Sequence, residues 1–89
     1  MQAYLVEFVG TMFFLYVILA IGEPIAIGAA LALAIIVGGK VSGGMYNPAV
    51  TIMMASAGKL KKADVVPYII AQVAGGLAAL ELTKVIKLK

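Results

Sequence analysis

The stretch VSGGMYNPAVT, residues 41–51, places two adjacent glycines and an Asn-Pro-Ala tripeptide directly after a long apolar run. Asparagine is a preferred helix N-cap and proline suits the first helical position, so Asn47 and Pro48 predict the start of a helix. Gly58 is typical of a helix end, which limits this helix to residues 48–57, or about 15 Å. That length is about half of a hydrocarbon core, so the stretch predicts a re-entrant half-helix entered through a glycine-rich loop at residues 40–46.

The composition indicates a membrane protein. Of the 89 residues, 64% are hydrophobic and 12% are charged, which is more apolar surface than a soluble domain of this size can carry. The chain has no cysteine and no histidine, so the usual metal ligands and general bases are lacking. We therefore expect neither an enzyme nor a bound metal or cofactor. The seven positive charges are scattered along the chain, so any attraction to the headgroups of membrane lipids is spread over separate lysines. Nothing in the sequence suggests binding to nucleic acid.

Three apolar segments have about the length that a bilayer crossing needs, at residues 3–21, 25–39 and 65–86. A signal peptide is the alternative interpretation of the first segment, but no basic region precedes it and Glu7 stands where positive charge is expected. The chain is therefore expected to be a single domain over residues 1–89. It should be an all-α, multi-pass protein of the cell or plasma membrane, with three transmembrane helices and one re-entrant helix.

The break at residues 41–51 has a physical meaning inside a membrane. Irregular backbone at membrane depth is tolerated only where protein packs around it or where it lines a water-filled cavity. An ordinary surface loop is the alternative, but the segment and the residues after it are too apolar for that: Met45, Tyr46, Val50, Ile52, Met53 and Met54. The segment therefore predicts a pathway or a packed interior.

Three motifs in register resemble the major intrinsic proteins, the family of aquaporins and glycerol channels. SGGMYNPAVT (residues 42–51) resembles the signature of the first half of these proteins, EFVGT (residues 7–11) their first helix, and YIIAQVAGG (residues 68–76) their third. Members normally carry two such halves in one chain, related by inversion in the membrane, and this sequence corresponds to one half. The resemblance implies a passive channel for water and small neutral solutes such as glycerol.

An odd number of spans places the two ends of a chain on opposite faces of the membrane. A second copy could then complete the family's pore only by inserting upside down, as an inverted homodimer. The lysines are nearly balanced between the faces, with Lys40, Lys59, Lys61 and Lys62 on one and Lys84, Lys87 and Lys89 on the other. Two alternatives remain: a different protein supplies the missing half, or the chain is a regulatory or structural membrane protein that does not transport. The family's tetramer of pores would here be four pairs, or eight chains.

In such a pair the Asn-Pro-Ala segments, Asn47, Pro48 and Ala49 of each copy, would meet near the midplane. Each half-helix contributes the positive end of its dipole, and Asn47 offers its amide N–H₂ to water, because its oxygen caps its own helix. This is the expected barrier to protons and cations. Backbone carbonyls of residues 43–45 (Gly43, Gly44 and Met45) would line the vestibule, where larger side chains would close it.

Two polar residues inside the spans need a role of their own. Glu7 is an ionisable group in a membrane helix, for which proton or ion handling is the default interpretation. The resemblance instead implies that Glu7 and Gln72 support the re-entrant loop through hydrogen bonds. Small residues recur every fourth position at Ala26, Ala30, Ala34 and Gly38 and at Ala71, Gly75 and Ala79, which predicts close helix packing.

The departures from the family concern the selectivity filter. The resemblance implies that Val50 stands where water-selective members carry an arginine, and that Ile27 stands at an aromatic or histidine position. The filter of an inverted pair would then be apolar, and we expect it to admit small neutral solutes such as glycerol as well as water.

Overall fold

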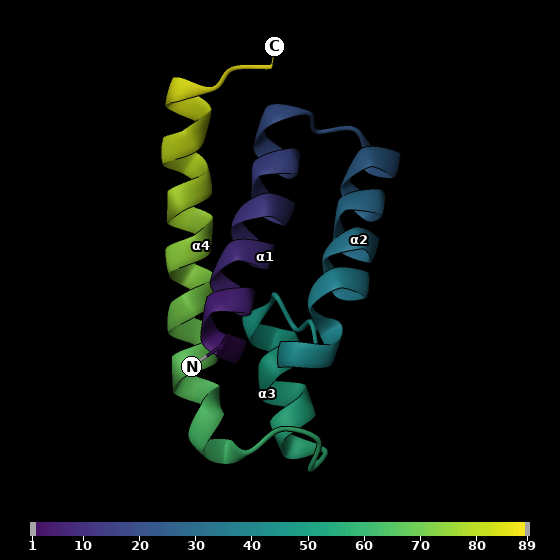
Figure 1. Cartoon of the computed structure of the whole chain (residues 1–89), viewed down its shortest axis with the longest axis vertical. Helices are drawn as coiled ribbons and strands as arrows, with labels where there is room; N and C mark the ends of the chain where they lie inside the picture. The colour runs from purple at the N-terminus through teal and green to yellow at the C-terminus, as the bar shows by residue number, and fades with distance from the viewer. Residues whose placement is uncertain (1, 89) are drawn as a thin grey trace.

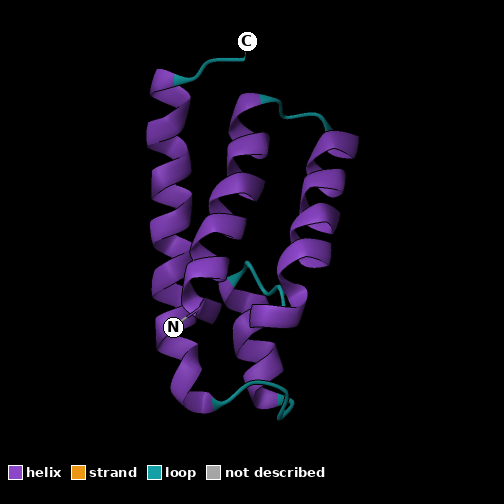
Figure 2. Cartoon of the chain, viewed as in Figure 1, coloured by secondary structure: helices purple, strands orange, loops and turns teal. Residues whose placement is uncertain are grey.

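Three long apolar helices and one short helix make up the computed structural model, which describes residues 2–88 (Figures 1 and 2). The elements are α1 (Gln2–Ala20), α2 (Pro24–Ser42), α3 (Pro48–Ser56), a 3₁₀ turn η1 (Lys62–Asp64) and α4 (Val65–Val85). Helices α1 and α2, and α4 together with η1, are long and apolar enough to cross a membrane. The predicted class, an all-α chain with three membrane-crossing helices and one short helix, is confirmed. Lys89, counted above among the lysines, lies outside the described residues.

Helix α1 packs against both α2 and α4. Gly75 explains the close approach of α4, because a Cβ atom there would lie 2.6 Å from the carbonyl oxygen of Phe8 on α1. Ala79, one turn further along, is completely buried. On α2 the buried positions are Ala30, Ala34, Gly38 and Ser42, which follow one another at intervals of four residues. Of the seven small residues predicted to mark packing faces, five are therefore buried, while Ala26 and Ala71 are half-buried.

Helix α2 continues three residues beyond the predicted end at residue 39, so the first part of the predicted loop is helical. The helix ends where Gly43 adopts a left-handed conformation (φ +88°) and donates its N–H to the Gly39 carbonyl at 2.8 Å. Tyr68 of α4 donates its hydroxyl hydrogen to the Ser42 carbonyl at 2.7 Å. This contact from another helix satisfies a carbonyl that the helix end leaves free.

Residues 43–47, here called the linker, turn back toward the middle of the bundle before α3 runs down again (Figure 2). Helix α3 has 9 residues against 19 in α1, so at 1.5 Å per residue it covers about half of α1's length. The loop that joins α3 to α4 and the loop that joins α1 to α2 lie at opposite ends of the molecule (Figure 1).

Candidate functional site

Glu7 lies at the centre of the site, fully buried on α1, and its carboxylate accepts four hydrogen bonds. Oε1 accepts from the backbone N–H of Tyr46 at 2.8 Å and from Gln72 Nε2 at 2.8 Å. Oε2 accepts from the Ser42 hydroxyl at 2.7 Å and from the backbone N–H of Met45 at 3.1 Å. The donors come from the end of α2, the linker and α4, so one carboxylate joins three segments. These protein donors replace the water that burial removes.

Gln72 extends this network to α3. Its Nε2 also donates to the Thr51 hydroxyl at 2.7 Å, and Thr51 in turn donates to the Asn47 carbonyl at 2.9 Å. Both amide hydrogens of Gln72 are therefore in use, which fixes the orientation of the amide. The structure thus places Glu7 and Gln72 against the linker and the first turn of α3, as the resemblance implied. That these contacts hold the linker in place remains a prediction.

Asn47 is the N-cap of α3. Its backbone is extended (φ −160°) and its Oδ1 accepts from the backbone N–H of Ala49 at 2.7 Å. The side-chain N–H₂ is left to face outward from this exposed residue, beside Pro48 at the first helical position. A helix start of this kind combines an amide donor with the positive end of the helix dipole, which suits a neutral hydrogen-bond acceptor such as water.

Three of the five linker residues have positive φ angles: Gly43 at +88°, Gly44 at +63° and Tyr46 at +53°. L side chains rarely adopt this conformation, so the backbone itself calls for glycine at the first two positions. This conformational reason for glycine does not depend on the earlier prediction that larger side chains would close a vestibule. Within residues 2–88, we find no donor to the carbonyl oxygens of Gly43, Gly44 and Met45. Met45 is buried and none of the three residues lines either groove of the single chain, so their pore-lining role stays a prediction.

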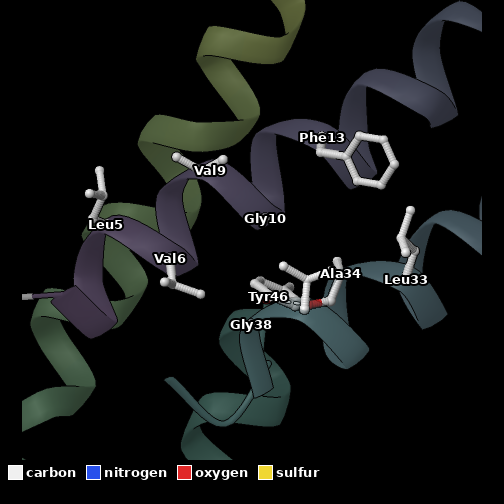
Figure 3. Close-up of a pocket in the computed structure, with 10 residues that line it drawn as sticks. Leu5, Val6, Val9, Gly10, Phe13, Leu33, Ala34, Gly38 and Tyr46 are labelled. Carbon is white, nitrogen blue, oxygen red and sulfur yellow. Dashed lines mark hydrogen bonds between the residues drawn. The ribbon is translucent and has the colours of Figure 1, made fainter. Parts of the chain in front are cut away.

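Tyr46 is a residue whose role the sequence did not reveal. Its ring lies between Gly10 of α1 and Gly38 of α2, and its hydroxyl donates to the Ala34 carbonyl at 2.7 Å (Figure 3). A Cβ atom on Gly10 would lie 2.6 Å from the ring carbon Cζ, so the ring needs glycine there. The ring also forms part of an apolar groove of about 440 Å³ between α1 and α2. Gly10 stands three residues after Glu7, on the same helix face, which is the one signal that could have pointed to this contact.

The two predicted filter residues are far apart in the fold. Ile27 is in the first turn of α2, at the end of the bundle that carries the loop from α1, whereas Val50 is in the first turn of α3 (Figure 1). Both side chains are half-buried. One chain therefore does not bring Ile27 and Val50 together, and a shared filter requires a second half.

A second groove, of about 490 Å³, lies beyond the start of α3 and is called the α1–α4 groove. Asn47 and Pro48 form its floor, and its walls come from α1 (Phe14, Leu15 and Leu19 among others) and from α4 (Val73, Gly76, Leu77 and Leu80). Since α3 covers only about half of the length of α1, the groove occupies the space beside the other half. Among residues 2–88 no cluster of three metal-ligating side chains is present.

The chain belongs to the major intrinsic protein family, whose family model matches residues 1–89. It is 42% identical to glycerol uptake facilitator protein-like 6 of Lactiplantibacillus plantarum, over 89% of this chain and 41% of the relative. It is 41% identical to aquaporin Z of Photorhabdus laumondii (74% of this chain, 29% of the relative) and 36% identical to aquaporin-8 of Mus musculus (96% and 37%). No solved structure gives a significant match.

The chain thus spans about two fifths, or less, of the length of these curated relatives. Membership of this family, together with the three apolar helices, makes it an integral membrane protein. The matched relatives are named for water and for glycerol, so both solutes enter the question of function.

Proposed function

We propose that this chain is half of a passive membrane channel for water and small neutral solutes such as glycerol, and that a second copy in antiparallel orientation completes the pore. The observation that carries the proposal is the α1–α4 groove, which continues the line of α3 and has Asn47 and Pro48 as its floor. A second half-helix entering from the other side would fill this space with its own N-terminus facing the first. An inverted copy provides a helix of that length and direction.

The meeting of two such N-termini gives the pathway its selectivity against charge. Each end carries about half a positive charge and one Asn47 amide donor, in a narrow path of low dielectric. A water molecule can accept from these donors, whereas a cation or an excess proton meets two positive ends. This supports a channel that favours neutral solutes over cations and protons.

The alternative is a pore whose second half belongs to a different polypeptide. The observation in its favour is that the chain matches only 41% of the length of the glycerol uptake facilitator relative. If a full pore forms, another polypeptide could supply the part that this chain does not match. The pure chain distinguishes the two proposals, because a pore made only of copies of this chain conducts without another protein.

Liposomes that contain only this chain should shrink, in stopped-flow light scattering, at least five times faster than protein-free liposomes when challenged with an impermeant osmolyte. Under a glycerol gradient they should shrink and then re-swell, because glycerol follows water. Shrinkage no faster than in protein-free liposomes, at confirmed protein content, would exclude the homodimer and leave the separate partner.

Filling the α1–α4 groove should block pairing. Leu77 lines the groove and is 61% exposed in the single chain, so Leu77→Trp adds bulk where the second half would pack. We expect at least a tenfold loss of water permeability in the same liposomes. Ile36→Trp is the matched control, because Ile36 is 75% exposed on α2 and lines neither groove. Equal permeability in the two variants would place the second half elsewhere.

A positively charged side chain at the predicted filter should reduce the passage of glycerol more than that of water. Val50→Arg adds a guanidinium beside the start of α3, where its donors favour water and its bulk excludes larger polyols. The ratio of glycerol to water permeability should fall at least fivefold. Val50→Met, of similar reach but apolar, should leave the ratio within a factor of two. A ratio that Val50→Arg does not change, in a variant that still conducts water, removes Val50 from the filter.

A further inference from the structure

The exposed charges are unevenly divided between the two ends of the molecule. Lys59, Lys61 and Lys62 lie in or next to the loop that joins α3 to α4, and Lys40 lies in the last turn of α2, toward the same end (Figure 1). All four are exposed. We call these four lysines the basic end.

None of the four lysines has a carboxylate partner within the described residues, where the only ion pair, Lys84–Glu81 at 3.0 Å, lies at the other end. Two acidic residues lie in this half of the molecule. Asp64 accepts a hydrogen bond from the Tyr4 hydroxyl at 2.7 Å, and the buried Glu7 accepts one from Ser42, two residues after Lys40. Four lysines against Asp64 and Glu7 leave a net charge of +2 there. At the other end, within residues 2–88, Lys84 and Lys87 balance Glu23 and Glu81.

The loop that carries three of these lysines is not covered by other parts of the chain. A Cβ atom on Gly58, in this loop, would have no neighbour within 4 Å. Apolar side chains border the loop on both sides, with Met53 of α3 54% exposed and Val66 of α4 65% exposed. Exposed lysines and exposed apolar side chains thus occur together at this end of the molecule.

We infer that the basic end binds the phosphate-bearing headgroups of anionic phospholipids. Lysine is a mobile point charge that binds phosphate without demanding one geometry, and an anionic membrane surface attracts each lysine near it. The adjacent apolar side chains favour a lipid over free phosphate, because a lipid places acyl chains beside Met53 and Val66 while its phosphate meets the lysines. The inference concerns the single chain and does not depend on pore formation.

The test is native mass spectrometry of the full chain in a neutral detergent. Phosphatidylglycerol, phosphatidylcholine with the same acyl chains, and inorganic phosphate are added in separate titrations. We expect phosphatidylglycerol to bind at least tenfold more tightly than phosphatidylcholine, and inorganic phosphate not to displace it at equal concentration. Raising the salt concentration should reduce this preference.

The decisive variants remove lysine charges from one end at a time, three from the basic end and two from the other. The triple variant K59Q/K61Q/K62Q should lower the preference for phosphatidylglycerol to less than threefold, while the control K84Q/K87Q should keep it within a factor of two of the parent. Circular dichroism should show the same helix content in both, because the three loop lysines are exposed and unpaired. Single substitutions, each expected to weaken binding two- to fivefold, repeat the test with less risk to folding.

Three results would overturn the inference. The parent could bind both lipids equally, the control variant could lose as much preference as the triple variant, or inorganic phosphate could displace the lipid at equal concentration. The last result would indicate a site for free anions rather than for a membrane surface.

Discussion

Chains forced into a single orientation should lose transport when expressed alone and regain it when two oppositely oriented variants are expressed together. Three lysines inserted after Met1 give the basic end a clear excess, which should hold that end in the cytoplasm. Lys61→Gln and Lys62→Gln, combined with three lysines added after Lys89, reverse the excess. We expect each variant alone to lose at least nine tenths of the water permeability of cells that express the parent, because an inverted pair needs both orientations.

Orientation is read independently of transport. The chain has no cysteine, so Ser56→Cys, an exposed position at the end of α3, gives one site for an impermeant thiol reagent. Restored permeability in co-expressing cells supports the inverted homodimer. Full permeability from both single variants, each labelled from one side only, would show that parallel copies or another protein form the pathway.

Replacing Glu7 by glutamine should release the linker. Whichever way the new amide is turned, its N–H₂ faces two of the donors that now bind the carboxylate, so charged hydrogen bonds are lost and donors are left unpaired. We expect the free energy of unfolding in detergent to fall by about 3 kcal/mol and water permeability to fall at least tenfold. Unfolding is followed by circular dichroism with increasing denaturant, and permeability in liposomes.

Glu23→Gln is the matched control for this change. Glu23 is an exposed N-cap whose Oε1 accepts from the Ala26 N–H at 2.8 Å, and glutamine keeps an oxygen that can accept the same bond. The control should cost less than about 1 kcal/mol and should leave permeability unchanged. If Glu7→Gln lowered the free energy of unfolding and the permeability no more than Glu23→Gln does, Glu7 would not hold the linker. A change in proton leak in that variant would then support the proton-handling interpretation.

The long helices could be predicted from the sequence because membrane crossing sets both their length and their apolar composition. The end of α2 could not be placed correctly from the same information. Gly38, Gly39 and Lys40 suggest a loop on local preference, since glycine disfavours helix. In the fold, Gly38 instead gives room to the ring of Tyr46 and to Val6, and Tyr68 donates to the Ser42 carbonyl, so contacts between helices extend α2 to Ser42.

The candidate site also has one part that the sequence predicts and one part that it does not. The N-cap at Asn47 depends on neighbouring residues only, and the sequence is enough to predict it. The position of Tyr46 depends on Gly10 and Gly38, two glycines that are distant from each other in sequence. Their facing surfaces exist only once α1 and α2 have packed. Sequence periodicity could mark Gly38 as a packing position, yet it could not show that a tyrosine from the linker would fill the space.

Glu7 contacts the linker through the main chain, and this has a consequence for substitutions in the linker. Two of its four donors are the peptide N–H groups of Met45 and Tyr46, which every residue except proline possesses. Mutation can therefore alter the side chain at position 45 without removing a hydrogen bond to the carboxylate. Tyr46 lacks this freedom because its ring is fitted between Gly10 and Gly38. A substitution at position 45 would thus keep the main-chain contact with Glu7, and its cost would come from the packing of this buried side chain.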